Sequence, residues 1–431
     1  MPNSRKLSGL YIANEDKLKF TAIADSDDDS DDDNDQFLDP NSFNIPSGRK
    51  FSTISRRNSV RSKISINGSA KDSTNIPITQ DYSSDLSQRT INDFKEINIL
   101  GIGSYGRVYL VEDVYTKKLY AKKTIKKAKI SIDEKLFKTH KNEREILSSI
   151  NHPSIVKLFY SFHDYQDINF ILEYIPGGEI FYHLSKTKRF NEFDTAFYLA
   201  EISQALTHLH KVAGVVYRDL KPENVLLNAQ GHVVLTDFGL SSLDEVCHSI
   251  LGTPQFTAPE VLKGEEYSYP ADWWSFGIMM YDMLVGETPF SGNNRAKIFN
   301  KILKTKLNIP DYLSEDAKDL LRKLINKKPE KRLKIDSDFE NLSNHRFFRK
   351  IDWENLRNLK PPIIPDTTDI SKANNFDHGY INLILAKEEK ILDNVEAEND
   401  QSKNDETDLF DNELFNGFSF VASKNFLDTH M

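Results

Sequence analysis

The sequence is poor in cysteine and in long apolar runs, and each shortage excludes a class of protein. Its 431 residues include one cysteine, Cys247, which cannot form an internal disulfide bond and has no cysteine-enzyme signature around it. A single thiol fits a reducing compartment, so we expect a location in the cytoplasm, with the nucleus as a second possibility. No apolar run reaches about 18 residues, so no transmembrane helix is expected.

Basic charge is also in short supply, with 56 Lys and Arg against 65 Asp and Glu and a net charge of −9. Binding to nucleic acid would favour a basic face, so no nucleic-acid partner is expected. The acids are concentrated, because eight of the eleven residues in 25–35 are aspartate. Such a block repels itself, and we predict that the acidic, serine-rich arm at 1–92 is disordered.

Strand and helix patterns begin after this arm. Residues 93–114 carry β-branched and aromatic residues around a glycine-rich turn and predict a hairpin, and 117–125 predicts a third strand. A charged helix is expected at 131–150, and two more strands in 156–175. The PGGE sequence at 176–179 then interrupts the pattern as a hinge would, and the chain beyond it is predominantly helical.

Two of these later helices have distinctive patterns. Residues 271–285 are apolar nearly all round, which predicts a helix buried on every side. In 191–210, Asn191 and Asp194 resemble a capping box. The same segment has an apolar stripe made of Phe193, Ala196, Phe197, Ala200 and Leu206.

Three glycines, Gly101, Gly103 and Gly106, mark a turn suited to phosphate. Without Cβ atoms, backbone N–H groups can approach phosphate oxygens closely. Dinucleotide-binding loops share this pattern but open a helix. Here the valine-rich residues 108–114 follow, which favours strand–loop–strand, and a plain hairpin turn would need only one of the glycines.

Lys122 and Lys123 lie in the third predicted strand, where either could neutralise phosphate charge. Glu143 in the following helix is a candidate ion-pair partner that would hold that lysine in place. Ordinary exposure to solvent is the alternative for all three side chains, and the strand pattern does not choose between the lysines.

The segments VVYRDLKPENVLL and VVLTDFGL carry the side chains that phosphoryl transfer requires. These are metal-binding oxygens, a group that orients the nucleophile, and positive charge near the moving phosphate. Asp237 and Asn224 supply hard oxygen ligands for Mg²⁺. Asp219 can accept the proton of a substrate hydroxyl, and Lys221 can neutralise charge on the γ-phosphate.

These motifs, in this order, resemble those of the eukaryotic protein kinases over about residues 94–348, together with AKK, NEREIL, APE and ADWWSFG. The resemblance implies an α+β, bilobal kinase fold. It places a small β-rich lobe with one key helix at 93–175 and a large, mainly helical lobe at 176–348. It implies ATP and Mg²⁺ as cofactors and assigns the strand lysine to Lys123, paired with Glu143. The KPEN sequence resembles the serine/threonine class.

Further roles follow from this resemblance alone. Leu172 occupies the gatekeeper position, and Glu260 is expected to pair with Arg332. The resemblance also implies that ATP is bound by Gly101, Ile102, Gly103, Ser104, Tyr105, Gly106, Val108, Ala121, Lys123, Glu173 and Leu226.

Beyond the catalytic domain, residues 349–423 resemble the tail of AGC-type kinases, which leaves 424–431 as an extension. NNFD at 374–377 looks like the tail motif that approaches the nucleotide. Residues 281–321 look most like the ribosomal-protein kinase branch, with a different AGC branch as the alternative.

LFNGFSF looks like the hydrophobic motif of the same tail and makes Ser419 a predicted phosphosite. Its aromatic residues are expected to dock in a small-lobe groove against the helix that carries Glu143, and so to hold the Lys123–Glu143 pair together. These residues are Phe415, Phe418 and Phe420.

Ser249 matches the activation-loop phosphosite, where an upstream activating kinase would add a phosphate able to pair with Arg218. Leu251 and Gln255 replace the more usual Cys and Glu, and Ser242 replaces a basic residue that often helps to bind the phosphate. Strict dependence on phosphate at Ser249 is therefore not expected.

Glu179, Glu223 and Asp282 match positions that bind arginines in basophilic relatives, which favours basic protein substrates, with ordinary surface acids as the alternative. Ser59 follows two arginines in the form R-R-x-S, which predicts phosphorylation by this kinase or a related one unless the arginines are there by chance.

Residues 410–414 resemble the docking signal for the target-of-rapamycin complex, and growth or nutrient signalling is the expected setting. A catalytically inactive scaffold is the alternative of a different class. Such a pseudokinase would normally lack Lys123, Asp219 or Asp237, and all three are present.

Overall fold

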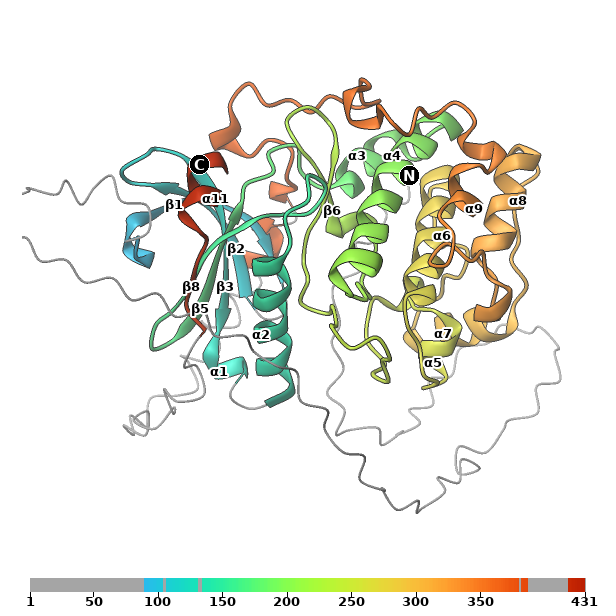
Figure 1. Ribbon diagram of the computed structural model, residues 1–431, viewed down its shortest axis with the longest axis horizontal. Helices are drawn as coiled ribbons and strands as arrows, with labels where there is room; N and C mark the ends of the chain where they lie inside the picture. The colour runs from blue at the N-terminus through green and yellow to red at the C-terminus, as the bar shows by residue number, and fades with distance from the viewer. Residues whose placement is uncertain (1–88, 104–105, 131–133, 380, 387–417, 431) are drawn as a thin grey trace, which may run out of the picture. The chain divides into compact units, whose positions relative to one another are not determined.

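A computed structural model describes residues 89–103, 106–130, 134–379, 381–386 and 418–430 (Figure 1). Several predicted features lie outside these residues: most of the arm at 1–92 with Ser59, the loop residues Ser104 and Tyr105, the docking sequence 410–414, and Phe415. Among the described residues, no helix is both long enough and apolar enough to cross a bilayer.

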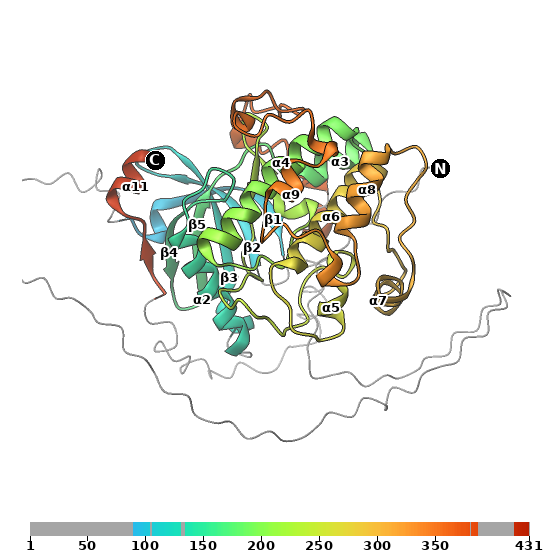
Figure 2. The same cartoon turned by 45° about the vertical axis from the view of Figure 1, so that its right-hand side comes forward.

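The small lobe is built on one antiparallel sheet with the strand order β1-β2-β3-β5-β4-β8 (Figures 1 and 2). The predicted hairpin and the three strands that follow it are confirmed. The strands are β1 (Phe94–Ile102), β2 (Gly106–Asp113), β3 (Leu119–Lys126), β4 (Leu158–His163), β5 (Asp167–Glu173) and β8 (Phe420–Val421). The short α1 (Lys127–Ile130) and the predicted helix, α2 (Glu134–Ser149), lie between β3 and β4.

Strand register gives this sheet two distinct faces. Ala121 lies opposite Leu172 and Lys123 opposite Phe170, so alternation along the strands places these four residues on one face. This inner face shares a core with α2 and with the large lobe. Tyr120 precedes Ala121 by one residue and therefore lies on the outer face, where a second, smaller hydrophobic core forms.

Ordered contacts begin earlier than the predicted domain start at residue 93. Arg89 is buried, its Nε lies 2.9 Å from the carboxylate of Asp113, and its guanidinium lies over the ring of Tyr115. A short 3₁₀ turn, Ile91–Asp93, leads from it into β1. Residues 89–92 of the predicted arm therefore belong to the folded domain, because the fully buried carboxylate of Asp113 requires a cationic partner.

The large lobe is mainly helical, as predicted (Figure 2). Its principal elements are α3 (Ile180–Thr187), α4 (Glu192–His208), β6 (Val225–Leu227), β7 (Val233–Leu235), α5 (Pro259–Leu262), α6 (Pro270–Val285), α7 (Arg295–Lys304), α8 (Glu315–Leu324) and α9 (Glu340–Ser343).

Burial along α4 and α6 tests the two helix patterns. All residues of α6 from Ala271 to Leu284 are buried, which confirms the prediction. Helix α4 starts where expected, with the Asn191 side chain accepting a hydrogen bond from the Asp194 amide at 2.9 Å. Phe193 is a correction, because its side chain is half exposed. It occupies the first turn of α4, one turn before the stripe becomes covered.

The predicted Glu260–Arg332 pair is confirmed in the large lobe. Both side chains are buried, and two parallel hydrogen bonds of 2.8 and 3.0 Å join them. Such a fork holds the segment after the activation loop against the turn that follows α8.

Candidate active site

The glycines that join β1 and β2 have different tasks. A Cβ on Gly106 would lie 1.7 Å from the Thr124 carbonyl oxygen, so only glycine fits beside β3. The Gly103 amide donates to the Gly106 carbonyl at 2.9 Å and closes the turn. Gly101, beside the strand-end residue Ile102, has no neighbour among the described residues within 4 Å of a Cβ position. Open space beside a backbone amide is what a phosphate oxygen requires.

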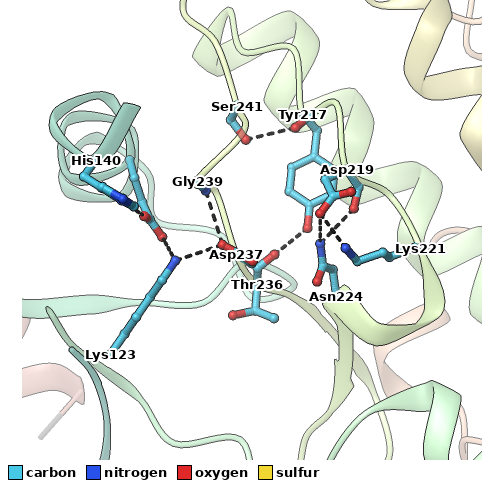
Figure 3. A network of polar contacts seen from close by, with 11 residues as sticks. Lys123, His140, Tyr217, Asp219, Lys221, Asn224, Thr236, Asp237, Gly239 and Ser241 are labelled. Atoms are coloured by element: carbon cyan, nitrogen blue, oxygen red, sulfur yellow. Dashed lines mark hydrogen bonds and ion pairs between the residues drawn. The ribbon is translucent and has the colours of Figure 1, made fainter. Parts of the chain in front are cut away.

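The sheet faces decide between the two strand lysines. The Lys123 ammonium lies 2.7 Å from Glu143 and 2.8 Å from Asp237, so it joins the helix α2 to the segment after β7 (Figure 3). Lys122 is on the opposite face and pairs with Glu96. The predicted Lys123–Glu143 contact is confirmed.

Charge pairing controls protonation in this cluster. Burial opposes ionisation of Asp237, but the charge and the hydrogen bond of Lys123 lower its pKa to about 2. Burial also opposes the charge on Lys123, yet the two carboxylates raise its pKa. Both groups are therefore fully charged at neutral pH.

The catalytic-loop residues form a second cluster around Asp219. One carboxylate oxygen accepts hydrogen bonds from Lys221 and Asn224, both at 2.8 Å (Figure 3). The other oxygen accepts one from the Thr253 hydroxyl at 3.0 Å. Lys221 also donates to Thr253 at 2.9 Å. All of the predicted residues in this loop are brought together.

The metal-ligand chemistry of Asn224 and Asp237 fits Mg²⁺. The Asn224 amide nitrogen donates to the backbone and side chain of Asp219, so its amide oxygen is the atom left to act as a ligand. Asp237 adds a charged oxygen at a backbone φ of 57°, a left-handed value that is rare outside glycine and concentrated at functional sites. Hard oxygen donors of this kind are those that Mg²⁺ prefers.

Some supporting residues were not predicted from the sequence. Asp272 at the start of α6 accepts hydrogen bonds from the backbone amides of Tyr217 and Arg218 at 2.8 and 2.7 Å, which fixes the catalytic loop. Thr253 is a second such residue. His140, 3.4 Å from Glu143, is a third supporting residue. Its position three residues before Glu143 on the same helix could have predicted this contact from the sequence.

A buried histidine reinforces this support. His210 contacts Asp272 at 2.8 Å and Asp336 at 2.9 Å. Burial lowers its pKa, but the two carboxylates outweigh that effect and raise the pKa to about 8. His210 therefore carries positive charge at neutral pH, which stabilises the buried Asp272 carboxylate.

The residues expected around the adenine share the inner face or lie close to it in the chain. Val108 pairs with Lys123 in register, and Ala121 with the gatekeeper-position residue Leu172. Glu173 follows at the end of β5, with its carboxylate 2.8 Å from Lys157. Leu226 on β6 packs against the same core. Their role in nucleotide binding stays a prediction.

The tail motif NNFD lies against the hinge. Asn375 is buried and donates to the Pro176 carbonyl at 2.9 Å. The ring of Phe376 stacks on Tyr174 at 6.2 Å. Gly178 has a left-handed φ of 71°, and a Cβ there would lie 2.0 Å from the Asn375 carbonyl oxygen. The tail and the hinge are therefore closely fitted, while contact with the nucleotide stays a prediction.

The three predicted substrate acids lie close to one another. Burial, followed by the charge of Glu223, raises the pKa of Glu179 to about 8. Burial also raises the pKa of Glu223 to about 7, and the neighbouring Asp282 adds to the effect. One buried carboxylate oxygen of Glu223 has no hydrogen-bond partner among the described residues. An isolated β-bridge joins Glu179 to Leu226, which places this acidic cluster beside the adenine-side residues.

Ser249 is exposed on the activation segment. Its carbonyl accepts a hydrogen bond from the Tyr267 hydroxyl at 2.7 Å, and that hydroxyl accepts one from Arg218 at 3.4 Å. Arg218 also donates to the Leu240 and Ser241 carbonyls. These contacts tie the activation segment to Arg218 of the catalytic loop.

The described residues of the hydrophobic motif lie against β4 and β5 of the sheet, while docking against α2 stays a prediction. Phe418 is buried with its ring 5.5 Å from that of Phe170, and its carbonyl accepts a hydrogen bond from the Ser161 hydroxyl at 2.7 Å. Ser419 is exposed and Phe420 half buried, as the alternation of a strand requires.

Comparison with known proteins supports this geometry. The protein kinase domain model matches residues 94–348. The chain is 40% identical to serine/threonine-protein kinase YPK3 of Saccharomyces cerevisiae, over 79% of this chain and 77% of that protein. It is 42% identical to a RAC family serine/threonine-protein kinase homolog of Dictyostelium discoideum, over 67% of this chain and 65% of that protein.

Ribosomal protein S6 kinase alpha-6 of Danio rerio is 40% identical over 80% of this chain. The match covers 46% of that relative, so this chain spans about half of its length. The inactive-scaffold alternative has no support, since Lys123, Asp219 and Asp237 are present and correctly clustered. The chain therefore belongs to the protein kinase family and is a serine/threonine protein kinase of the AGC type.

Proposed function

We propose that this kinase transfers the γ-phosphoryl group of Mg-ATP to serine and threonine in basic, arginine-containing proteins. The observation that carries the proposal is the pair of carboxylates Glu179 and Glu223. Their pKa values are raised to about 8 and about 7, and a buried oxygen of Glu223 has no hydrogen-bond partner in the part of the chain that the structure describes. A guanidinium would supply the missing hydrogen bonds and restore ionisation of both acids.

The chain's own residues have complementary tasks in this transfer. Asp219, held by Lys221 and Thr253, orients the substrate hydroxyl and accepts its proton. Lys221 is also poised to neutralise charge developing on the transferred phosphate. Lys123 binds the phosphates of the nucleotide, and Asn224 and Asp237 would hold Mg²⁺, which neutralises phosphate charge when bound.

The test is a peptide series that differs only in the number of arginines before the acceptor serine. Glu223→Gln should lower kcat/KM about 10- to 100-fold for the arginine-rich peptide and leave the arginine-free peptide unchanged. Glu330→Gln, an exposed acid of the large lobe, is the matched control. Equal losses on both peptides would contradict the proposed specificity.

Phosphorylation of Ser249 by an upstream kinase is proposed to strengthen activity, not to be required for it. The support is the set of hydrogen bonds from Arg218 and Tyr267 that already hold the segment. Ser249→Ala should reduce turnover without abolishing it, and complete loss would reject this view. Mass spectrometry of wild type and Asp219→Ala separates self-phosphorylation at Ser59 and Ser419 from the action of another kinase.

We further propose a role in growth or nutrient signalling within the ribosomal-protein kinase branch. The names of the S6 kinase relatives and the sequence at 410–414 support it. Substituting alanine for Phe410 should reduce co-purification with the target-of-rapamycin complex. The proposed location is the cytoplasm, with access to the nucleus, and fluorescence microscopy of the tagged chain tests it.

A further inference from the structure

Residues 418–430 clasp the β4 edge of the sheet from both faces. Phe418 belongs to the inner core, whereas Ala422 and Leu427 belong to the outer one. Between them, β8 pairs with β4, and the seven-residue helix α11 (Lys424–His430) lies on the side of the sheet away from α2 (Figures 1 and 2). The segment is thus a clamp made of an inner aromatic anchor, an edge strand and an outer helix.

The edge strand is too short to hold this segment alone. It contributes two residue pairs with β4, and one further backbone hydrogen bond runs from Ala422 to the Phe159 carbonyl at 2.9 Å. Strands in globular proteins are usually longer, and a seven-residue helix is marginal without packing. The packing is supplied by Leu427, which is fully buried, and by Phe426, whose ring lies 5.8 Å from that of Phe159.

A second tie holds the last turn of α11. The Lys118 ammonium donates to the His430 carbonyl at 2.6 Å. A cation at the C-terminal end of a helix satisfies an otherwise unpaired carbonyl and complements the helix dipole. The helix is therefore fixed at its middle and at its end, next to the start of β3.

Strand register connects this clamp directly to the catalytic lysine. Phe420 lies opposite Ser161, Ser161 opposite Phe170, and Phe170 opposite Lys123. The row continues through Val108 to Gly101 of the glycine-rich turn. The hydrophobic motif thus stands at one end of a single cross-strand row, and the phosphate-binding elements stand at the other.

We propose that α11 positions this row: Leu427 and Phe426 keep the hydrophobic motif seated on β4 and thereby hold Lys123 and Glu143 in register for the nucleotide phosphates. The inference rests on the proposed role of the hydrophobic motif. It adds that seating depends on Phe418 and α11 and not on the Ser419 side chain, because Phe418 is buried while Ser419 faces solvent.

The test uses the full chain with Leu427→Asp as the disrupting variant. Leu427→Met is the conservative variant, and Asp428→Asn is the matched control at the neighbouring exposed position. Leu427→Asp should speed hydrogen exchange in peptides covering β4, α2 and 418–430. It should raise the KM for ATP about tenfold, more than it lowers kcat, while Leu427→Met and Asp428→Asn resemble wild type. Ser419→Ala should change the KM for ATP by less than about threefold.

Slow exchange must persist in α6 of Leu427→Asp, which shows that the large lobe stays folded. If it does not, Phe426→Ala replaces that variant, with the same expected direction. Unchanged exchange in α2 with an unchanged KM for ATP would overturn the proposal, as would a Ser419→Ala variant that releases 418–430. Exchange is measured without a peptide substrate, so failure of the proposed basic specificity leaves this result unaffected.

Discussion

Two acidic regions of this kinase differ in how their charges are balanced. In the catalytic centre, Asp219 and Asp237 each contact a lysine ammonium at 2.8 Å. In the proposed substrate region, Glu179 and Glu223 are neighbours of like charge, and the charge of Lys221 lowers the pKa of each without offsetting the effect of burial. Balanced acids are ionised and fixed before any ligand arrives. Acids without such a partner stay partly protonated at neutral pH and become ionised when a cationic ligand binds.

The largest effect should come from breaking the balanced region. Asp219→Asn keeps the shape of the side chain but removes the group that accepts the hydroxyl proton. Turnover should fall about 100- to 10,000-fold in a radiolabel transfer assay with a basic peptide. Asp244→Asn, an exposed acid of the activation segment, is the control and should behave as wild type. Retained turnover in Asp219→Asn would show that the carboxylate is not the proton acceptor.

A pH titration should sharpen the contrast in the unbalanced region. Groups with raised pKa values are neutral at low pH, so the attraction of Glu179 and Glu223 for arginine is lost as the pH falls through about 8 and about 7. KM for an arginine-rich peptide should therefore decrease about tenfold between pH 6 and 8. The double variant Glu179→Gln with Glu223→Gln should show a flat profile, and an unchanged slope would assign the effect elsewhere.

The ion pairs of His210 with Asp272 and Asp336 should make protein stability depend on pH. Its folded pKa of about 8 exceeds the ordinary value of 6.5, so its contribution to stability is complete below pH 6.5 and is lost as the pH rises past about 8. Across this pH window, the unfolding free energy of wild type should fall by about 2 kcal/mol more than that of His210→Gln. Urea unfolding at pH 6, 7 and 8.5 measures the difference, and parallel pH dependences would contradict the assignment.

The smallest effect is expected at the lysine next to the catalytic one. Lys122 pairs with the half-exposed Glu96 on the outer face, and such pairs contribute about 1 kcal/mol or less. Lys122→Met should therefore keep wild-type turnover, whereas Lys123→Met should lose it. Similar losses in both variants would mean that position on the sheet face does not separate the two lysines.

The sequence allowed prediction of residues that occur together in short motifs. Asp219, Lys221 and Asn224 lie within six positions, and their clustering follows from one loop. The choice of Lys123 over Lys122 needed the family register, because strand pattern alone could not tell which face meets α2. The ion pair of Arg89 with Asp113 was missed, since nothing local in the sequence indicates that Asp113 requires this charge.

Residues that act across the fold were beyond sequence reasoning. Asp272 binds the catalytic-loop amides from 54 and 55 positions away, and Thr253 reaches Asp219 across 34. Helix α11 is too short for its two apolar residues to form a periodic pattern. Phe193 fits the stripe of α4 by spacing, but periodicity does not say where the covering elements stop.

The fit between Gly178 and Asn375 makes the position of the tail depend on the hinge. The two segments are joined across 199 positions of sequence by hydrogen bonding at Pro176, and no side chain can be added at Gly178 without displacing the tail backbone. A methyl group added at Gly178 would push the backbone of Asn375 away. The tail can therefore be loosened by a substitution in the hinge, outside the tail itself.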